Sequence, residues 1–261
     1  MRGLLGNQSR QPIRPERYDE AYFLNSCEGY EEFIVSEGAH LSRRLSQAFA
    51  VAQVKPGMRV LDVGCGRGEI LYSCADLGIE AHGIDFAPVA VRMAKRAGWA
   101  CQANAKYLPY RDAVFDRVLM FDIVEHLHTW ELRQALAEVR RVLHPDGRLI
   151  VHTAPNAWYD RCAYPVVRLV RTLMGQGERY PRDPRAIVPA NLDVHVNEQS
   201  VFSLWWVLAR TGFRAKVWLD TPPQNRSEGP VLAAARRVLF NCPPFQWFFE
   251  REVFAVARLK G

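Results

Sequence analysis

A glycine-rich segment near residue 60 constrains the fold of this chain more than any other stretch. The residues Arg59–Val63 (RVLDV) have the composition of a buried strand, and the next five are Gly-Cys-Gly-Arg-Gly, ending at Gly68. Glycine permits sharp backbone bends and a close approach of a ligand, and the first N–H groups of the helix that follows are free to face that ligand. We therefore expect a strand, a tight turn and a helix at the edge of a nucleotide-type binding site.

The spacing of the glycines narrows the class of ligand. A dinucleotide fingerprint that starts at Gly64 requires glycine or alanine at position 69, where this chain has Glu69. A pyrophosphate is disfavoured next to that carboxylate because like charges repel. A ligand that carries an adenosine and a cationic centre, but no phosphate, fits this turn better.

The order of apolar runs and helical stretches predicts an α/β fold. Between residues 59 and 153 the two alternate, which is typical of βαβ units with a parallel sheet. The expected elements are strands at 59–63, 80–85, 99–103, 115–121 and 147–153, helices after Gly68 and at 87–97 and 129–143, and a turn at 144–147. A helix at 198–210 and strands at 213–219 and 252–259 would complete the sheet. Right-handed crossovers should place helices on both faces.

Three segments lie outside this alternation. Residues 16–54 have the pattern of N-terminal helices, and residues 155–197 contain a helical stretch at 164–174 followed by a Gly/Pro/Arg-rich loop at 175–189. A loop of that length usually covers a site or is disordered. Residues 222–250 form an aromatic-rich insertion before the last strand.

Composition indicates a soluble cytoplasmic protein. Six cysteines are scattered without a CxxC pair, so neither a disulfide framework nor a zinc site is expected. The first 15 residues lack the apolar stretch of a signal peptide, and no uncharged run approaches the length that spans a bilayer. The net charge is +6, but the arginines are spread along the chain, so we expect a mildly basic surface and no specific nucleic-acid partner.

Several motifs in the right order resemble those of the class I S-adenosylmethionine (SAM) methyltransferases. Asp62 followed by Gly64-x-Gly66-x-Gly68 resembles motif I of that family, and Asp85 stands at the end of the second strand, where the family has an acidic residue. Further matches are NAKYLPY at 104–110 for the family's DAxxLPF, FDRV at 115–118, HPDG at 144–147 and TGF at 211–213. The resemblance covers roughly residues 58–213. It implies a Rossmann-like seven-stranded sheet, mostly parallel with an antiparallel last strand.

The resemblance also implies a cofactor site and a division of the chain. SAM, with S-adenosylhomocysteine as product, would be bound by Tyr22, Asp62, Gly64, Cys65, Gly66, Gly68, Asp85, Phe86, Asn104, Ala105 and Phe121. Asp85 would accept from both ribose hydroxyls, whereas Asn104 keeps an acceptor oxygen for the adenine but drops the family's charge. Residues 1–55 would form a helical lid, 56–156 the SAM-binding core, 157–200 a substrate cap, and 201–261 the completion of the sheet, with an insertion at 222–250. Tyr18 and Tyr22 resemble lid aromatics, although packing of an amphipathic helix explains them equally well.

Candidate catalytic residues follow the fourth strand and end the cap. Glu125 and His126 should lie at the sheet edge where acceptor meets cofactor, and His195 resembles a histidine found ahead of the next helix in related enzymes. A neutral imidazole is a natural acceptor of a hydroxyl proton. Asp122, Glu125, His126 and His195 also resemble the divalent-metal set of some O-methyltransferases. A metal-free site is the favoured prediction, and the metal is the alternative.

The resulting functional prediction is a SAM-dependent methyltransferase. It would transfer a methyl group by in-line SN2 displacement to a small-molecule hydroxyl of a sugar, a phenol or quinone, or a natural product. An RNA or lipid-linked substrate, or a non-catalytic SAM-binding protein, remains open. Peripheral membrane contact also remains an alternative, since residues 164–174 carry Arg168 and Arg171 among apolar residues and residues 231–249 are basic and aromatic. No sequence feature specifies an oligomeric state.

Overall fold

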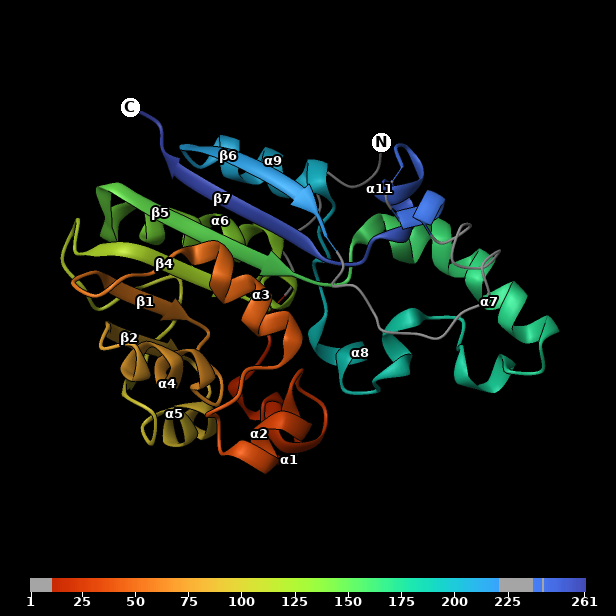
Figure 1. The fold of residues 1–261 in the computed structure, drawn as a ribbon, viewed down its shortest axis with the longest axis horizontal. Coiled ribbons are helices and arrows are strands. Elements are labelled where there is room, and N and C mark those ends of the chain that lie inside the picture. The colour runs from red at the N-terminus through yellow and green to blue at the C-terminus, as the bar shows by residue number, and fades with distance from the viewer. Residues whose placement is uncertain (1–10, 221–236, 241) are drawn as a thin grey trace.

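A seven-stranded sheet forms the centre of the molecule, with the strand order β3-β2-β1-β4-β5-β7-β6 (Figure 1). The computed structural model describes residues 11–220, 237–240 and 242–261. The strands are β1 (Arg59–Val63), β2 (Glu80–Asp85), β3 (Trp99–Gln102), β4 (Phe115–Phe121), β5 (Leu143–Thr153), β6 (Phe213–Leu219) and β7 (Val253–Leu259). The pairs from β3 to β5 are parallel, and β7 runs antiparallel to both β5 and β6. The prediction of a mostly parallel Rossmann-like sheet with an antiparallel last strand is confirmed.

Helices cover both faces of the sheet because the central strands are apolar on both sides. On one face α3 (Arg43–Ala52) and α4 (Glu69–Asp76) pack with Leu119 and Ile150. On the other face α6 (Thr129–Val142) and α9 (Val201–Arg210) pack with Val118 and Val151. Neighbouring residues of β4 and β5 thus point into opposite clusters, as the two-residue repeat of a strand requires. Helix α5 (Pro88–Ala94) contacts β2 and β3.

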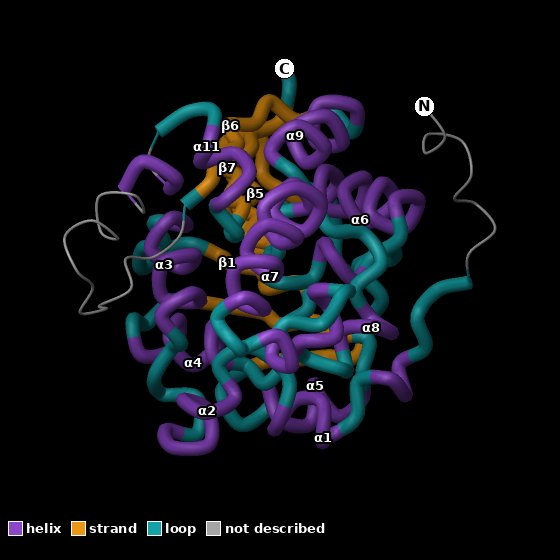
Figure 2. The backbone as a smooth tube through the Cα atoms, turned by 90° about the vertical axis from the view of Figure 1, so that its right-hand side faces the viewer, coloured by secondary structure: helices purple, strands orange, loops and turns teal. Residues whose placement is uncertain are grey.

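The remaining helices lie at the carboxyl edge of the sheet and beyond it. The N-terminal part holds η1 (Pro15–Arg17), α1 (Glu20–Asn25) and α2 (Tyr30–Ser36), and the segment after β5 holds η3 (Tyr159–Ala163), α7 (Tyr164–Leu173), η4 (Gly177–Arg179), η5 (Pro184–Ile187) and α8 (Asn191–Val194). The loop expected at 175–189 therefore contains two short helices. Figure 1 and Figure 2 show α7 projecting from the end of the sheet.

Four strands (β1, β2, β4 and β6) have the predicted bounds, other predicted elements differ by one to three residues at an end, and the fifth strand differs more. Pro88 begins α5 because proline suits the first turn of a helix, and Ser200 caps α9, which therefore starts at Val201. The prediction of a turn at 144–147 was wrong, since β5 already begins at Leu143. Leu143 pairs with Phe115 and Arg148 with Arg117, so the ladder contains a register shift that accommodates the HPDG sequence within the strand.

Two observations limit the other sequence predictions. Among the described residues, no helix is both long and apolar enough to cross a membrane. The 222–250 insertion is described only in part, where α11 (Phe245–Phe249) precedes the last strand. Residues 1–10 of the expected lid, and residues 221–236 and 241 of the insertion, lie outside the described residues.

Gly68 provides a test of how the turn is built. Its φ is +92°, and an added Cβ would lie 2.7 Å from the Cα of Ala94 on α5. We expect Gly68→Ala to lower the free energy of unfolding by about 3 kcal/mol, because backbone strain and an overpacked contact add together. Urea denaturation followed by circular dichroism measures this loss.

Gly57 supplies the matched control. Its φ is +88°, but nothing lies within 4 Å of an added Cβ. Gly57→Ala should therefore cost only the strain, about 1 kcal/mol. Equal losses for the two variants would contradict the close packing of the glycine turn on α5.

Candidate functional site

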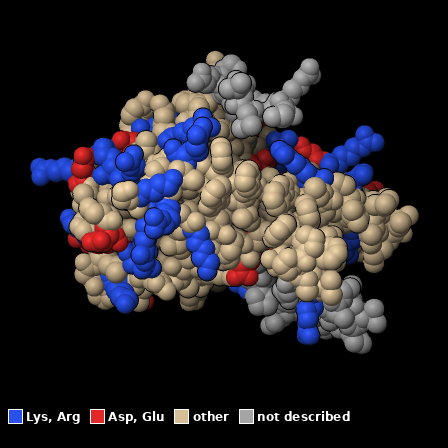
Figure 3. All heavy atoms as spheres, turned by 90° about the horizontal axis from the view of Figure 1, so that it is seen from above, with Lys and Arg blue, Asp and Glu red and all other residues tan. Residues whose placement is uncertain are grey.

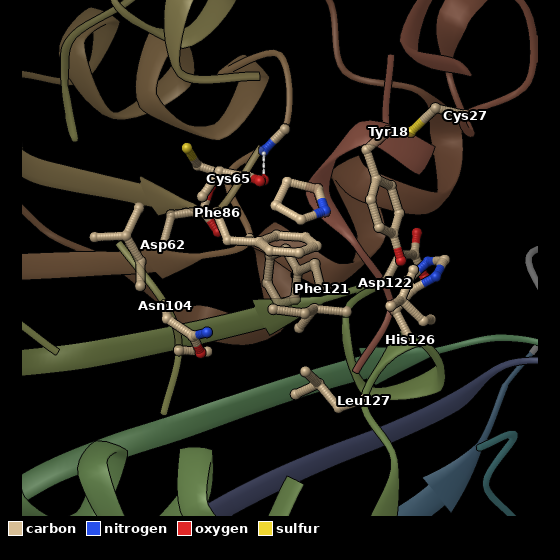
Figure 4. A pocket seen from close by; sticks show the side chains of 18 of the residues that line it. Tyr18, Cys27, Asp62, Cys65, Phe86, Asn104, Phe121, Asp122, His126 and Leu127 are labelled. Atoms are coloured by element: carbon tan, nitrogen blue, oxygen red, sulfur yellow. Dashed lines mark hydrogen bonds between the residues drawn. The ribbon is translucent and has the colours of Figure 1, made fainter. Parts of the chain in front are cut away.

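A cavity of about 510 Å³ lies at the carboxyl ends of β1, β2 and β4, where the strand order reverses (Figure 4). Open α/β sheets bind ligands at this point. Its lining includes the predicted residues Tyr22, Asp62, Gly64, Cys65, Gly66, Asp85, Phe86, Asn104, Ala105 and Phe121. Gly68 is not part of the lining, because it faces α5. The cavity therefore brings together residues that lie as far apart in sequence as the N-terminal helices and the end of β4.

Asp85 fixes the shape of the glycine turn from the neighbouring strand. The backbone N–H of Gly66 donates to Asp85 Oδ2 at 3.1 Å, and the N–H of Ala87 donates to Oδ1 at 2.9 Å. The amides of Gly64 and Cys65 donate to the carbonyl of Ile84 at 2.8 and 2.9 Å. The end of β2 thus holds the turn through three hydrogen bonds, and the fourth joins Asp85 to the start of α5. Each Asp85 oxygen keeps a second lone pair for a ligand.

The walls near the turn carry buried acidic groups. Burial, followed by repulsion from Glu69 and Asp85, raises the pKa of Asp62 to about 8. Burial also raises the pKa of Asp85 to about 6, although the backbone hydrogen bonds from Ala87 and Gly66 act in the opposite direction. Two buried carboxyl groups favour a ligand that brings positive charge and hydrogen-bond donors, since such a ligand stabilises the ionised forms.

Arg67 connects the glycine turn to the N-terminal helices, a role that sequence reasoning missed. Its Nε donates to Glu69 Oε1 at 2.7 Å, its Nη1 donates to the carbonyl of Phe23 at 2.7 Å, and its Nη2 donates to the carbonyl of Glu28. The Glu69 carboxylate is therefore neutralised by Arg67. The argument that this carboxylate repels pyrophosphate loses force, and the acidic character of the site rests on Asp62 and Asp85.

Aromatic residues of the N-terminal helices roof the cavity. Tyr18, Tyr22 and Phe23 are buried, and the Tyr18 ring lies 5.1 Å from that of Tyr22 and 5.3 Å from that of Phe86. The carbonyl of Gln11 is 3.1 Å from His128 Nε2, which fastens the first described residues to the core. The roof explains how water would be kept from a bound ligand.

The side chain of Asn104 shapes its own loop. Its Oδ1 accepts from the backbone N–H of Lys106 at 3.0 Å. Lys106 in turn pairs with Glu131 and lies over the ring of Trp130. The amide oxygen that the sequence analysis reserved for a ligand therefore already has one internal partner. Its second lone pair is available to a ligand on the cavity side.

Glu125, His126 and His195 form a compact group at the other end of the cavity. The carbonyl of Glu125 accepts from the amides of Val196 and Asn197 at 2.9 and 3.0 Å, which draws the end of the cap onto the segment after β4. The rings of His126 and His195 consequently lie 4.9 Å apart. One ligand atom from each of the three side chains falls within 4.8 Å of the other two. The sequence prediction that placed these residues together is consistent with this arrangement.

Hydrogen bonds and burial set the protonation states of the group. Thr153 Oγ1 donates to Glu125 Oε2 at 2.7 Å, and His126 Nδ1 lies 3.0 Å from the carbonyl of Val194. Burial and the charge of Asp122 raise the pKa of Glu125 to about 8. Burial lowers the pKa of His126 to about 4, and burial together with His126 lowers that of His195 to about 3. Near neutral pH the group therefore holds a protonated carboxyl and two neutral imidazoles.

This donor set also suits a divalent cation. Neutral imidazoles and a carboxylate are common ligands of zinc and first-row transition metals, and a bound cation would favour the ionised form of Glu125. His195 Nδ1 is buried without a hydrogen-bond partner, which leaves it free to act as a ligand. Asp122, the fourth residue of the metal alternative, is not part of the group, because it faces His152 instead.

Asp122 belongs to a buried ionic network beside the cavity. His152 Nδ1 lies 2.9 Å from Asp122 Oδ1, and His152 Nε2 lies 3.4 Å from Glu252 Oε2. Arg44 Nε is 3.5 Å from Glu252 Oε1. Burial alone would lower the pKa of His152, but the charges of Asp122 and Glu252 raise it to about 9. The same pairing, with Arg44, lowers the pKa of Asp122 to about 2 despite its burial.

The raised pKa of His152 predicts a pH-dependent stability. The stabilisation is fully present below the ordinary pKa of 6.5 and is lost as the pH rises through about 9. The difference in unfolding free energy between wild type and His152→Gln should therefore shrink by about 3 kcal/mol between about pH 6 and pH 10. Urea denaturation across this window provides the measurement, and a constant difference would show that His152 is not charged in the folded protein.

Comparisons with known proteins agree with the geometry. Residues 61–151 match the family model described as a methyltransferase domain. Probable tRNA methyltransferase 9B of Mus musculus is 33% identical over 100 residues, which are 38% of this chain and 22% of that protein. Demethylmenaquinone methyltransferase of Thermus thermophilus is 34% identical over 131 residues, which are 47% of this chain and 58% of that protein.

A structural comparison extends the likeness to the fold. The crystal structure of a SAM-dependent methyltransferase from Archaeoglobus fulgidus matches with a TM-score of 0.57 and 21% identity, covering 88% of this chain and 99% of that one. The chain spans less than two thirds of the length of the curated relatives described above. The sequence similarity thus concerns the central domain, and the structural similarity concerns the fold.

Proposed function

We propose that this chain, which carries a methyltransferase domain over residues 61–151, transfers a methyl group from SAM to a hydroxyl group of a small-molecule acceptor. The observation that carries the proposal is that one cavity holds both a buried acidic wall and His126, a neutral imidazole that Glu125 and His195 adjoin. The division into a lid at 1–55, a core at 56–156, a cap at 157–200 and a completing segment at 201–261 belongs to this proposal. All six cysteines are free, which suits a cytoplasmic setting.

The acidic end of the cavity fits the donor. Asp85 would accept from ribose hydroxyls with the lone pairs that Gly66 and Ala87 leave unused, and Asp62 would accept from the amino group. Figure 4 places Phe86 and Phe121 in the middle of the cavity, where their ring faces suit an adenine or a cationic sulfur. Of the three Lys and Arg residues in the lining, Arg14 is exposed, whereas the buried Arg67 and Lys106 are engaged in ion pairs, so neither buried cation is free for a phosphate.

The chain's own residues have three tasks in such a reaction. Bound SAM supplies a methyl group that its sulfonium centre already activates. The protein must hold the acceptor oxygen in line with that group, exclude water and remove the hydroxyl proton. The N-terminal roof would exclude water, and the apolar side chains of Phe121, Ile123 and Leu127 would orient an apolar or aromatic acceptor.

His126 is the proposed proton acceptor. A backbone carbonyl can only accept, so the contact with Val194 places the proton on Nδ1 and leaves the lone pair on Nε2. His126 lines the cavity, whereas Glu125 and His195 are not among its lining residues. Glu125 and His195 would therefore act on the acceptor through His126 or through a cation held by all three. A macromolecular acceptor, as the name of the tRNA methyltransferase relative suggests, and a non-catalytic role remain the competing hypotheses.

The affinity for SAM tests the role of Asp85 in the proposed cofactor site. Asp85→Ala removes two hydrogen-bonded carboxylate oxygens, and we expect the dissociation constant for SAM to rise by about a hundredfold, the equivalent of two charge-assisted bonds. Isothermal titration calorimetry measures the change, with Asp112→Ala as control because that carboxylate is exposed and pairs only with Arg141. Unchanged affinity in folded Asp85→Ala protein would refute the assigned cofactor site.

Methyl transfer tests His126. His126→Gln should lower kcat by about a thousandfold with SAM affinity retained, because general-base catalysis contributes on that scale. The assay follows labelled methyl from SAM into a panel of phenols, quinones and sugars, and His144, which lies outside the cavity lining, provides the His144→Gln control. A kcat within about tenfold of wild type would exclude His126 as the base.

Treatment with a chelator distinguishes a histidine base from a bound metal ion. The proposal expects enzyme treated with a chelator to keep its activity, since neutral imidazole accepts the proton directly. Loss of activity on chelation and recovery with Mg²⁺, Mn²⁺ or Zn²⁺ would replace the base with a cation bound by Glu125, His126 and His195.

A further inference from the structure

The outward face of α7 is apolar. Val166, Leu169, Val170 and Leu173 stand three or four residues apart, and with Met174 they are between 49% and 80% exposed. Residues at this spacing share one side of a helix. The side chains therefore form a continuous strip, which we call the α7 strip.

The basic residues of the same helix point inward. Tyr164 OH donates to the carbonyl of Pro181 at 2.8 Å, and Arg168 Nε donates to the carbonyl of Tyr180 at 3.0 Å. Arg171 Nη1 donates to Gln176 Oε1 at 3.0 Å. A helix on an ordinary water-exposed surface buries its apolar side and turns its charges outward. In α7 this orientation is reversed, and hydrogen bonds to the cap fix the reversal.

The position and the length of α7 favour contact with a membrane surface. Figure 1 shows α7 standing away from the sheet. Its ten residues correspond to about 15 Å of helix, half of what a bilayer core requires. The helix therefore suits a position within a membrane surface, parallel to it, and not across it.

The charges around α7 indicate that the membrane surface it contacts is anionic. Residues 160–185 contain six arginines and three acidic residues, a local excess of +3. Arg161, Arg179 and Arg182 in this stretch are exposed. Figure 3 shows the end of the molecule that α7 forms as largely uncharged, with basic side chains beside it. Arginines next to an apolar strip match the arrangement of anionic headgroups above acyl chains.

Exposed aromatic residues near the base of α7 add to this surface. Helix α11 contacts η3, the turn that leads into α7, and the rings of Trp158 and Phe248 lie 5.8 Å apart. Phe245 and Trp247 of α11 are almost half exposed. Tryptophan is enriched at the boundary between lipid and water.

We propose that α7 rests on an anionic lipid membrane, with the α7 strip entering the boundary between headgroups and acyl chains and the surrounding arginines contacting lipid phosphates. This surface is separate from the cavity. Binding requires neither the cofactor nor the acceptor, so the test stands or fails independently of the proposed reaction.

Vesicle sedimentation of the full chain tests the proposal. We expect binding to phosphatidylcholine vesicles that contain about 30% phosphatidylglycerol, with at least about tenfold weaker binding to pure phosphatidylcholine or in high salt. Leu169→Glu combined with Leu173→Glu should lower the partition coefficient by at least about tenfold, because two apolar contacts are replaced by like charges facing an anionic surface. Arg179→Glu with Arg182→Glu should also weaken binding, and more at low salt than at high salt.

Phe202→Glu on α9 is the matched control, since Phe202 is 59% exposed on another helix. It should bind vesicles as the wild type does. Circular dichroism and the melting temperature confirm that each variant folds. No wild-type binding to the anionic vesicles, or equal loss in the α7 and α9 variants, would overturn the proposal. A wild-type dimer in sedimentation velocity that the α7 variant dissociates, without vesicle binding, would also overturn it and assign the strip to a second copy of the chain.

Discussion

The two hydrogen bonds that the Asp85 carboxylate accepts are the interaction on which the arrangement of the carboxyl edge of the sheet depends. One oxygen accepts from Gly66 in the glycine turn and the other from Ala87 just before α5. Without these two bonds the glycine turn and the start of α5 would have no shared anchor at the switch point of the sheet. The carboxylate is kept in a buried position where its ionisation is unfavourable, so a ligand that donates hydrogen bonds or brings positive charge relieves an existing energetic penalty. The Asp85 carboxylate therefore holds the backbone in place and also favours the binding of such a ligand.

The cavity separates two electrostatic environments. At one end Asp62 and Asp85 are carboxyl groups that a cationic ligand would ionise, and at the other end His126, which adjoins Glu125 and His195, is a neutral imidazole near pH 7. The fixed charges of Asp122, His152, Glu252 and Arg44 are paired among themselves behind this second end. A cationic donor would thus lie beside the acidic residues, and an uncharged acceptor would lie beside the neutral ones. The proton released in the transfer would meet imidazoles that are unprotonated.

Local sequence signals predicted most of the fold and about half of the site. The glycine turn, the strands from β1 to β4 and the positions of Asp62 and Asp85 follow from short-range patterns, since turn chemistry and strand periodicity are local properties. Arg67 could not be assigned, because its partners are carbonyls of Phe23 and Glu28, about 40 positions away, which a sequence pattern does not mark. The diversion of Asp122 to His152 was missed for the same reason. The early start of β5 was missed because a proline and a glycine usually indicate a turn, and here pairing with Phe115 outweighs them.

Arg67 sets how firmly the roof of the cavity is held to its floor. Its guanidinium holds the carbonyls of Phe23 and Glu28 against the glycine turn, so residues that roof the cavity are fastened to its floor. Movement of the roof away from this floor would have to break both hydrogen bonds. A separate, smaller pocket with Arg17, Asp19, Tyr22 and Asp193 in its lining lies between the N-terminal helices and the end of the cap, and the ion pair between Arg17 and Asp193 there is weak because both side chains are exposed. The N-terminal roof is therefore held firmly on the side of the glycine turn and only weakly on the side of the cap.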